Sequence, residues 1–141
     1  MKRRIQFIAI HCTATQQNAK PEAIQRYWRN HLGWKNPGYH LLIDAAGKVH
    51  RLLDFNLIAN GVKGFNQVSV HISYIGGIDR NGKGIDNRTE AQKKAIIDCI
   101  NEVIAWLDNK KLIIQGHRDF PHQNKACPCF DAIPEYKHLI K

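Results

Sequence analysis

Hydrophobic residues along the chain follow two patterns, short unbroken runs and longer stretches with helical spacing. A short apolar run between polar residues is typical of a buried strand. We predict strands at residues 5–10, 39–43, 49–53, 70–75 and 112–115. The second and third runs are separated by a short turn sequence that contains Gly47, which predicts a β-hairpin.

Two longer stretches place apolar residues on one helical face. Pro21 suits the first position of a helix, and Gly33 can end that helix. Thr89 and Gln92 match a capping box, in which each side chain bonds the backbone N–H of the other residue. We predict helices at residues 21–32 and 90–109 and a short final helix that Asp131 caps.

Strand and helix patterns alternate along the sequence. We therefore expect an α/β domain with a central mixed β-sheet of about five strands, flanked by two main helices and a short C-terminal helix. A length of 141 residues suits one domain, and no repeat, low-complexity tract or linker divides the chain. We predict a single domain over residues 1–141, with surface loops at 54–68 and 79–87.

The composition, 43% hydrophobic and 23% charged residues, is typical of a folded globular chain. No apolar run approaches the roughly 18 to 20 residues of a membrane-spanning helix, so we expect no association with a membrane. The basic start at Met1 leads into only about six apolar residues, which is too short for a secretory signal. We expect the protein to begin in the cytoplasm.

The chain is strongly basic, with 21 Lys and Arg residues against 12 acidic residues and a formal charge of +9. Such a charge favours polyanions, and nucleic acid, anionic membrane and anionic cell wall all qualify. The positive residues are scattered, and the sequence contains no zinc-finger spacing, basic zipper region or RNA-binding aromatic motif. We therefore expect no nucleic-acid partner, although charge alone does not choose among the polyanions.

Four cysteines are present, and without an export signal we expect thiols rather than disulfides. Cys99 lies among apolar helix positions, where it is predicted to be a small buried hydrophobic residue. The other three, Cys12, Cys127 and Cys129, remain available for chemistry.

Two predicted strands end in a histidine, His11 and His117. Neighbouring strands lie about 5 Å apart, so their ends can present two imidazoles to one metal ion. A catalytic zinc takes three protein ligands and leaves a position open for water. The segment Cys127-Pro-Cys129 is irregular and can fold back over His117, so a thiolate from it could be the third ligand. Spacing equally allows a structural strand-end histidine and buried thiols.

A set of short motifs occurs in one order over residues 10–131. They are Ile10-His-Cys-Thr-Ala-Thr15, Gly33-Trp34, Gly38-Tyr-His-Leu-Leu-Ile43, Lys63-Gly-Phe-Asn66, Ile75-Gly-Gly-Ile-Asp79, Gly116-His-Arg-Asp119 and Lys125-Ala-Cys-Pro-Cys-Phe-Asp131. Together they resemble the N-acetylmuramoyl-L-alanine amidase family of T7-type phage lysozymes, which shares its fold with animal peptidoglycan recognition proteins.

The resemblance implies roles for five residues. The zinc ligands of the family match His11, His117 and Cys127, and its catalytic tyrosine and lysine match Tyr39 and Lys125. Zn²⁺ would polarise the scissile carbonyl and lower the pKa of water. The phenol and the ammonium would stabilise the oxyanion, and one of them would help to protonate the departing amine.

Other cysteines and one glycine bear on this interpretation. Cys129 lies two residues beyond Cys127 and is predicted to be accessory, since an extended segment would turn its thiol to the opposite side. A disulfide between Cys129 and Cys12 is conceivable but has no support. Several relatives carry a histidine where this chain has Gly61, so one contact near the substrate is missing and the fine substrate preference is open.

The remaining histidines are not expected to bind metal. His40 and His71 are predicted to be structural strand histidines. The other four are expected to face solvent; they are His31, His50, His122 and His138.

The resemblance implies an enzyme that hydrolyses the amide between the muramic acid lactyl group and L-alanine in bacterial peptidoglycan. We expect a monomeric phage or prophage endolysin, cytoplasmic until a holin or a specialised secretion route releases it to the cell wall. One alternative is a peptidoglycan-binding module of the same fold that does not cut. Another is a basic nucleic-acid-binding protein with a structural zinc, which would need a fourth ligand such as Cys129 or His122.

Overall fold

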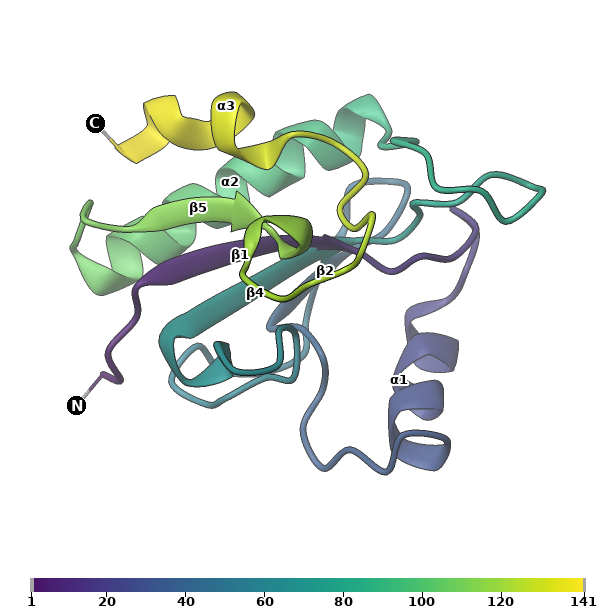
Figure 1. Ribbon diagram of the computed structural model, residues 1–141, viewed down its shortest axis with the longest axis horizontal. Coiled ribbons are helices and arrows are strands. Elements are labelled where there is room, and N and C mark those ends of the chain that lie inside the picture. The colour runs from purple at the N-terminus through teal and green to yellow at the C-terminus, as the bar shows by residue number, and fades with distance from the viewer. Residues whose placement is uncertain (1, 141) are drawn as a thin grey trace.

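The computed structural model describes residues 2–140 and contains a sheet with the strand order β3-β2-β4-β1-β5 (Figure 1). Strands β2, β4, β1 and β5 pair in parallel, whereas β3 is antiparallel to β2. The five-stranded sheet is therefore mixed, as predicted. The strands are β1 (Phe7–Cys12), β2 (Leu41–Ile43), β3 (Val49–Arg51), β4 (Ser69–Tyr74) and β5 (Ile113–Gly116).

The helices divide into a layer on the sheet and one helix apart from it. Helix α2 packs on β4 and β2, and α3 packs on β5. Helix α1 lies away from this layer, beyond the carboxyl ends of the strands (Figure 1). The helices are α1 (Pro21–Asn30), α2 (Glu90–Leu107) and α3 (Ala132–Tyr136), with short 3₁₀ turns η1 (Asn66–Val68), η2 (His117–Asp119) and η3 (Lys137–Ile140).

Local sequence explains where the two long helices begin. Pro21 occupies the start of α1, where its missing N–H has no helical partner to lose. At α2 the predicted capping box is present, because the Gln92 N–H donates to Thr89 Oγ1 and the Thr89 N–H donates to Gln92 Oε1. Asp108 takes a left-handed backbone with φ of 52° and ends α2. Both helices end two residues before the predicted bound.

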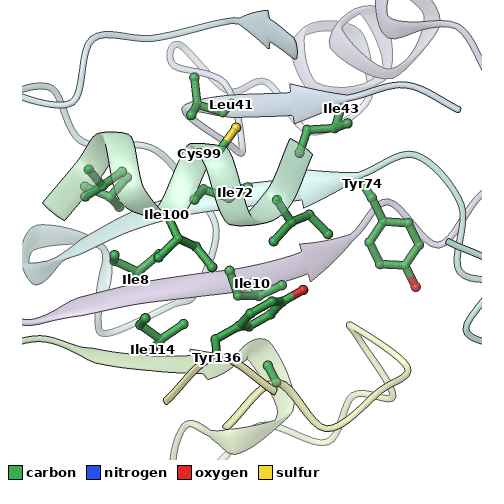
Figure 2. Close-up of a cluster of buried hydrophobic side chains, with 14 of the residues drawn as sticks. Ile8, Ile10, Leu41, Ile43, Ile72, Tyr74, Cys99, Ile100, Ile114 and Tyr136 are labelled. Atoms are coloured by element: carbon green, nitrogen blue, oxygen red, sulfur yellow. The ribbon is translucent and has the colours of Figure 1, made fainter. Parts of the chain in front are cut away.

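Central strand β1 is covered on both faces. Ile8, Ile10 and Cys12 belong to the hydrophobic core beneath α2 and α3, where Figure 2 shows the two isoleucines. Ala9 packs in a second apolar cluster on the opposite face, and His11 points to the same side as Ala9 because successive strand side chains alternate. The strand lies two residues further along the chain than predicted, so it includes the histidine.

Strand β4 repeats the alternation beside β1. Its residues Ile72 and Tyr74 belong to the core with Cys99 of α2, which is buried as predicted (Figure 2). His71 and Ser73 are also fully buried and turn toward the opposite face. This face therefore receives the polar side chains of both central strands.

The length and hydropathy of each helix decide whether it could span a membrane. Within residues 2–140, no helix is both long and apolar enough to cross a bilayer.

His40, at the entrance to β2, is a buried polar contributor to the fold. Its Nδ1 accepts a hydrogen bond of 3.0 Å from the His71 backbone N–H, and its Nε2 donates to the Leu57 carbonyl at 2.8 Å. Burial is the main cause that lowers the pKa of His40 from its ordinary 6.5 to about 4. The structural role predicted for His40 agrees with this environment, in which the neutral imidazole is the stable form.

We expect this residue to make the metal-free fold sensitive to mild acid. Between pH 6.5 and about 4 the unfolded chain binds a proton at His40 that the folded chain does not, so stability falls as the pH drops. In His40→Asn, which keeps an acceptor for the His71 N–H, the free energy of unfolding should depend less steeply on pH, by up to about 1.4 kcal/mol per pH unit. Urea unfolding of both proteins across this window measures the slopes, and equal slopes would contradict the assignment.

Candidate metal centre and active site

Two strand ends and one loop bring His11, His117 and Cys127 together. His11 is the next-to-last residue of β1, and His117 directly follows β5, the parallel neighbour of β1. One ligand atom from each of the three side chains lies within 4.8 Å of the others. The Cys127 Sγ lies 3.8 Å from His11 Nδ1, and the two imidazole centroids are 5.0 Å apart. The residues predicted as ligands therefore converge.

The loop between β5 and α3 folds back across the strand ends to place Cys127 (Figure 1). The Tyr74 hydroxyl at the end of β4 donates a 2.7 Å hydrogen bond to the Pro128 carbonyl, and the Arg118 N–H donates to the Cys127 carbonyl at 3.0 Å. Gly116 leaves room for this loop, since a Cβ there would lie 2.5 Å from Pro128 Cδ. These contacts join the cysteine to the sheet.

The surroundings of the three cysteines on this edge distinguish one of them. The Cys12 backbone N–H donates to Cys127 Sγ at 3.2 Å, so this sulfur is held against the end of β1. Cys129 instead donates to the Gly77 carbonyl, and burial is the main cause that raises its pKa to about 11. Contact with Cys127, followed by burial, raises the pKa of the Cys12 thiol. All three are free thiols, and Cys129 lies outside the converging group.

Hydrogen bonds occupy one nitrogen of each candidate imidazole. Gln123 donates through its amide nitrogen to the Pro121 carbonyl, so its Oε1 is the acceptor for the His117 Nε2–H at 3.0 Å. The His117 Nδ1 thereby keeps a free lone pair. His11 Nε2 in turn lies 2.9 Å from His71 Nδ1.

Both candidate imidazoles favour the neutral form that binds metals. Burial lowers the pKa of His11 well below its ordinary value, and the neighbouring His117 lowers it further. Burial also lowers the pKa of His117; the Gln123 hydrogen bond opposes this effect, and the Lys125 charge adds to it. Two neutral imidazoles and a thiol that can ionise form a donor set that fits Zn²⁺ with an open position.

Tyr39 and Lys125 line a pocket of about 220 Å³ together with His117 and Cys127. The Tyr39 ring centroid lies 4.9 Å from that of His11, and its hydroxyl donates to the Cys12 carbonyl at 3.2 Å. Burial is the main cause that raises the pKa of Tyr39, so the phenol stays protonated. Lys125 is exposed and makes no hydrogen bond or ion pair within residues 2–140. Its ammonium group is therefore available to a ligand.

The pocket continues into a larger hollow of about 580 Å³, which also contains Lys63 and His122. Trp34, Asn60 and Gly61 line both spaces, so the two form one groove around Lys125. Trp34 lies within a recognised motif, but neither it nor Asn60 was assigned a role from the sequence. The available signals were a polar residue in the predicted loop 54–68 for Asn60 and an aromatic residue in the Gly33-Trp34 motif for Trp34.

The other histidines follow the predictions with one exception. His40 and His71 are buried at the sheet, whereas His31, His122 and His138 are exposed. His50 was predicted to face solvent, and this is wrong. It is half-buried because its Nε2 pairs with the Asp44 carboxylate across the hairpin at 2.9 Å.

The fold and the gathered side chains define an α/β domain of the type found in cell-wall amidases and peptidoglycan recognition proteins. The amidase LysC from Clostridium intestinale has a TM-score of 0.77 and 20% identity, with 97% of this chain and 85% of that chain covered. Bumblebee peptidoglycan recognition protein SA has a TM-score of 0.78 and 20% identity, covering 97% and 84%. At these identities the likeness establishes the fold.

Sequence comparison establishes the family. The family described as N-acetylmuramoyl-L-alanine amidase matches residues 1–130, so the chain belongs to that family. The endolysin of Enterobacteria phage K11 is 34% identical over 123 residues, which cover 86% of this chain and 79% of the endolysin. The endolysin of Escherichia phage T7 is 32% identical over 126 residues, covering 88% and 80%. The family expected from the sequence motifs is confirmed.

We expect separate replacement of Cys127 and Cys129 by serine to distinguish their roles. Cys127→Ser should lose most bound zinc because it replaces the thiolate donor, whereas the matched control Cys129→Ser should keep it. Elemental analysis after dialysis against buffer with trace zinc gives the metal content of each protein. Zinc loss from Cys129→Ser alone would overturn the assignment.

Proposed function

We propose that the chain is a zinc-dependent N-acetylmuramoyl-L-alanine amidase that hydrolyses the bond between the muramic acid lactyl group and L-alanine of peptidoglycan. The observation that carries this proposal is the convergence of His11, His117 and Cys127 beside a pocket that contains Tyr39 and Lys125. Membership of the amidase family and similarity to phage endolysins support the substrate and the bond.

In this proposal the three converging side chains hold the metal, each through one donor atom. When bound, zinc would act as a Lewis acid toward the scissile carbonyl and would lower the pKa of a water molecule. The surrounding residues would keep the imidazoles neutral and oriented, as the Gln123 hydrogen bond to His117 does.

Tyr39 and Lys125 would act on the oxygen and nitrogen of the scissile amide. The neutral Tyr39 phenol can turn its O–H from the Cys12 carbonyl to the oxyanion, which is a stronger acceptor. The Lys125 ammonium, at the pocket wall, adds positive charge near that oxygen. These two groups also carry the protons available to the departing amine.

The biological setting follows from the relatives and from charge. We propose a phage or prophage endolysin that stays in the cytoplasm until it is released to the cell wall, and that acts as a monomer. The formal charge of +9 would concentrate the protein on the anionic wall. Peptidoglycan is thus the proposed partner, and neither nucleic acid nor membrane is required.

Digestion of purified sacculi tests bond, activity and metal together. We expect new free L-alanine amino termini and intact disaccharides with unmodified lactyl groups, identified by mass spectrometry. A chelator should abolish the release, and added zinc should restore it, because the metal supplies the Lewis acid. A zinc-loaded protein that binds sacculi without releasing amino termini would instead support a binding module.

Lys125→Ala should keep zinc and fold but lose turnover by roughly 100-fold, in line with removal of one group that stabilises an oxyanion. The matched control is Lys111→Ala. Lys111 is an exposed lysine that precedes β5, whereas His117 follows the other end of that strand. Initial rates on a soluble muropeptide, measured with zinc content, compare the variants. An unchanged rate for Lys125→Ala would remove this residue from the mechanism.

A further inference from the structure

We propose that His71 is a positioning residue for the metal centre. Its imidazole holds His11 in the tautomer and orientation that direct the His11 Nδ1 to the metal. The inference rests on the proposed zinc site and adds a residue that is not itself a ligand. It also connects that residue to Gly61, the position at which the chain departs from its relatives.

Strand register brings the two imidazoles together. In the parallel pair of β1 and β4, Ala9 lies opposite His71 and His11 lies opposite Ser73, so the two histidines are diagonal neighbours. Both point away from the isoleucine core because strand side chains alternate. Their ring centroids are 5.0 Å apart, and His11 Nε2 lies 2.9 Å from His71 Nδ1. This distance is that of a good hydrogen bond.

The chemistry of a ligand histidine sets the direction of this hydrogen bond. His11 Nδ1 faces the Cys127 sulfur at 3.8 Å, and it can bind a metal only through a free lone pair. The proton of the neutral His11 ring then lies on Nε2, which needs an acceptor in a fully buried place. His71 Nδ1 is that acceptor. Gln123 Oε1 has the same relation to His117, so both rings present Nδ1.

Packing alone does not account for a histidine at position 71. Its side chain is 0% exposed, its ring stacks on that of His40 at 5.8 Å, and its Nε2 has no hydrogen-bond partner within residues 2–140. A buried polar atom without a partner costs about 1 to 3 kcal/mol, so an apolar side chain of similar size would suit the core better. Among the residues that the structure describes, the one side-chain hydrogen bond of this ring is to His11.

Gly61 provides the space that His71 occupies. A Cβ built at residue 61 would lie 2.2 Å from His71 Nδ1 and 2.6 Å from two carbons of the ring. Any side chain there would displace the imidazole at the very atom that faces His11. Several relatives carry a histidine at this loop position, whereas this chain has Gly61 there and the imidazole beside it comes from His71 of β4.

Three variants test the proposal through metal affinity and not only through activity. His71→Leu should weaken zinc binding by about 10- to 100-fold, the usual effect of removing a hydrogen-bond partner of a ligand histidine. His71→Asn, whose Oδ1 can replace Nδ1 as acceptor, should stay within about threefold of wild type. Gly61→Ala should weaken zinc binding as His71→Leu does, because it displaces the ring.

Zinc dissociation constants come from competition with a chromophoric chelator, and the visible spectrum of the Co²⁺-substituted protein reports ligand geometry. The matched control His50→Leu changes a histidine away from the centre and should leave both readouts unchanged. The unfolding midpoint of metal-free His71→Leu should change little, because two effects of opposite sign meet: the unpartnered His71 Nε2 is removed, and the His11 Nε2–H loses its acceptor.

The outcomes separate the two proposals. Wild-type protein that binds no zinc overturns the proposed function. If wild-type protein binds zinc, and His71→Leu and Gly61→Ala each bind it as tightly as wild type does, only the positioning role is overturned. If His71→Leu does not fold, the affinity of Gly61→Ala and the Co²⁺ spectrum of His71→Asn decide: weakened affinity and a native spectrum support the role, and native affinity of Gly61→Ala refutes it.

Discussion

The alternation of side chains along the central strand β1 is the constraint on which both the core and the site depend. Ile8 and Ile10 point into the apolar layer under α2, so His11 must point to the other side. Parallel neighbours β4 and β5 end at the same edge, and they deliver His71 and His117 to the same region. A slip of one residue in this register would turn the histidine into the isoleucine core.

The contribution of the loop after β5 is of a different kind. It carries Cys127, and it has little periodic structure of its own. Its geometry comes from contacts with distant residues, above all the Tyr74 hydroxyl and the open space at Gly116. The candidate metal centre therefore forms only when the sheet and this loop are both in place.

The charge of the candidate metal centre differs from the net charge of the whole molecule. The surface is basic, yet the buried imidazoles are neutral because burial disfavours their charged form. Neutral donors suit a divalent cation, and the exposed Lys125 supplies positive charge only at the pocket wall. The basic surface and the neutral buried imidazoles are thus separate features of the charge distribution.

Local pattern in the sequence determined the elements, since capping at Thr89, the apolar strands and the strand-end positions of His11 and His117 depend on neighbouring residues. Motif order added the family. The motifs already favoured Cys127 over Cys129, and the tertiary structure showed that its side chain converges with the two imidazoles. The tertiary structure alone decided that His71 fills the space at Gly61 and that its ring meets His11. The physical reason is that these contacts join residues distant in sequence, whose distance and orientation no local pattern encodes.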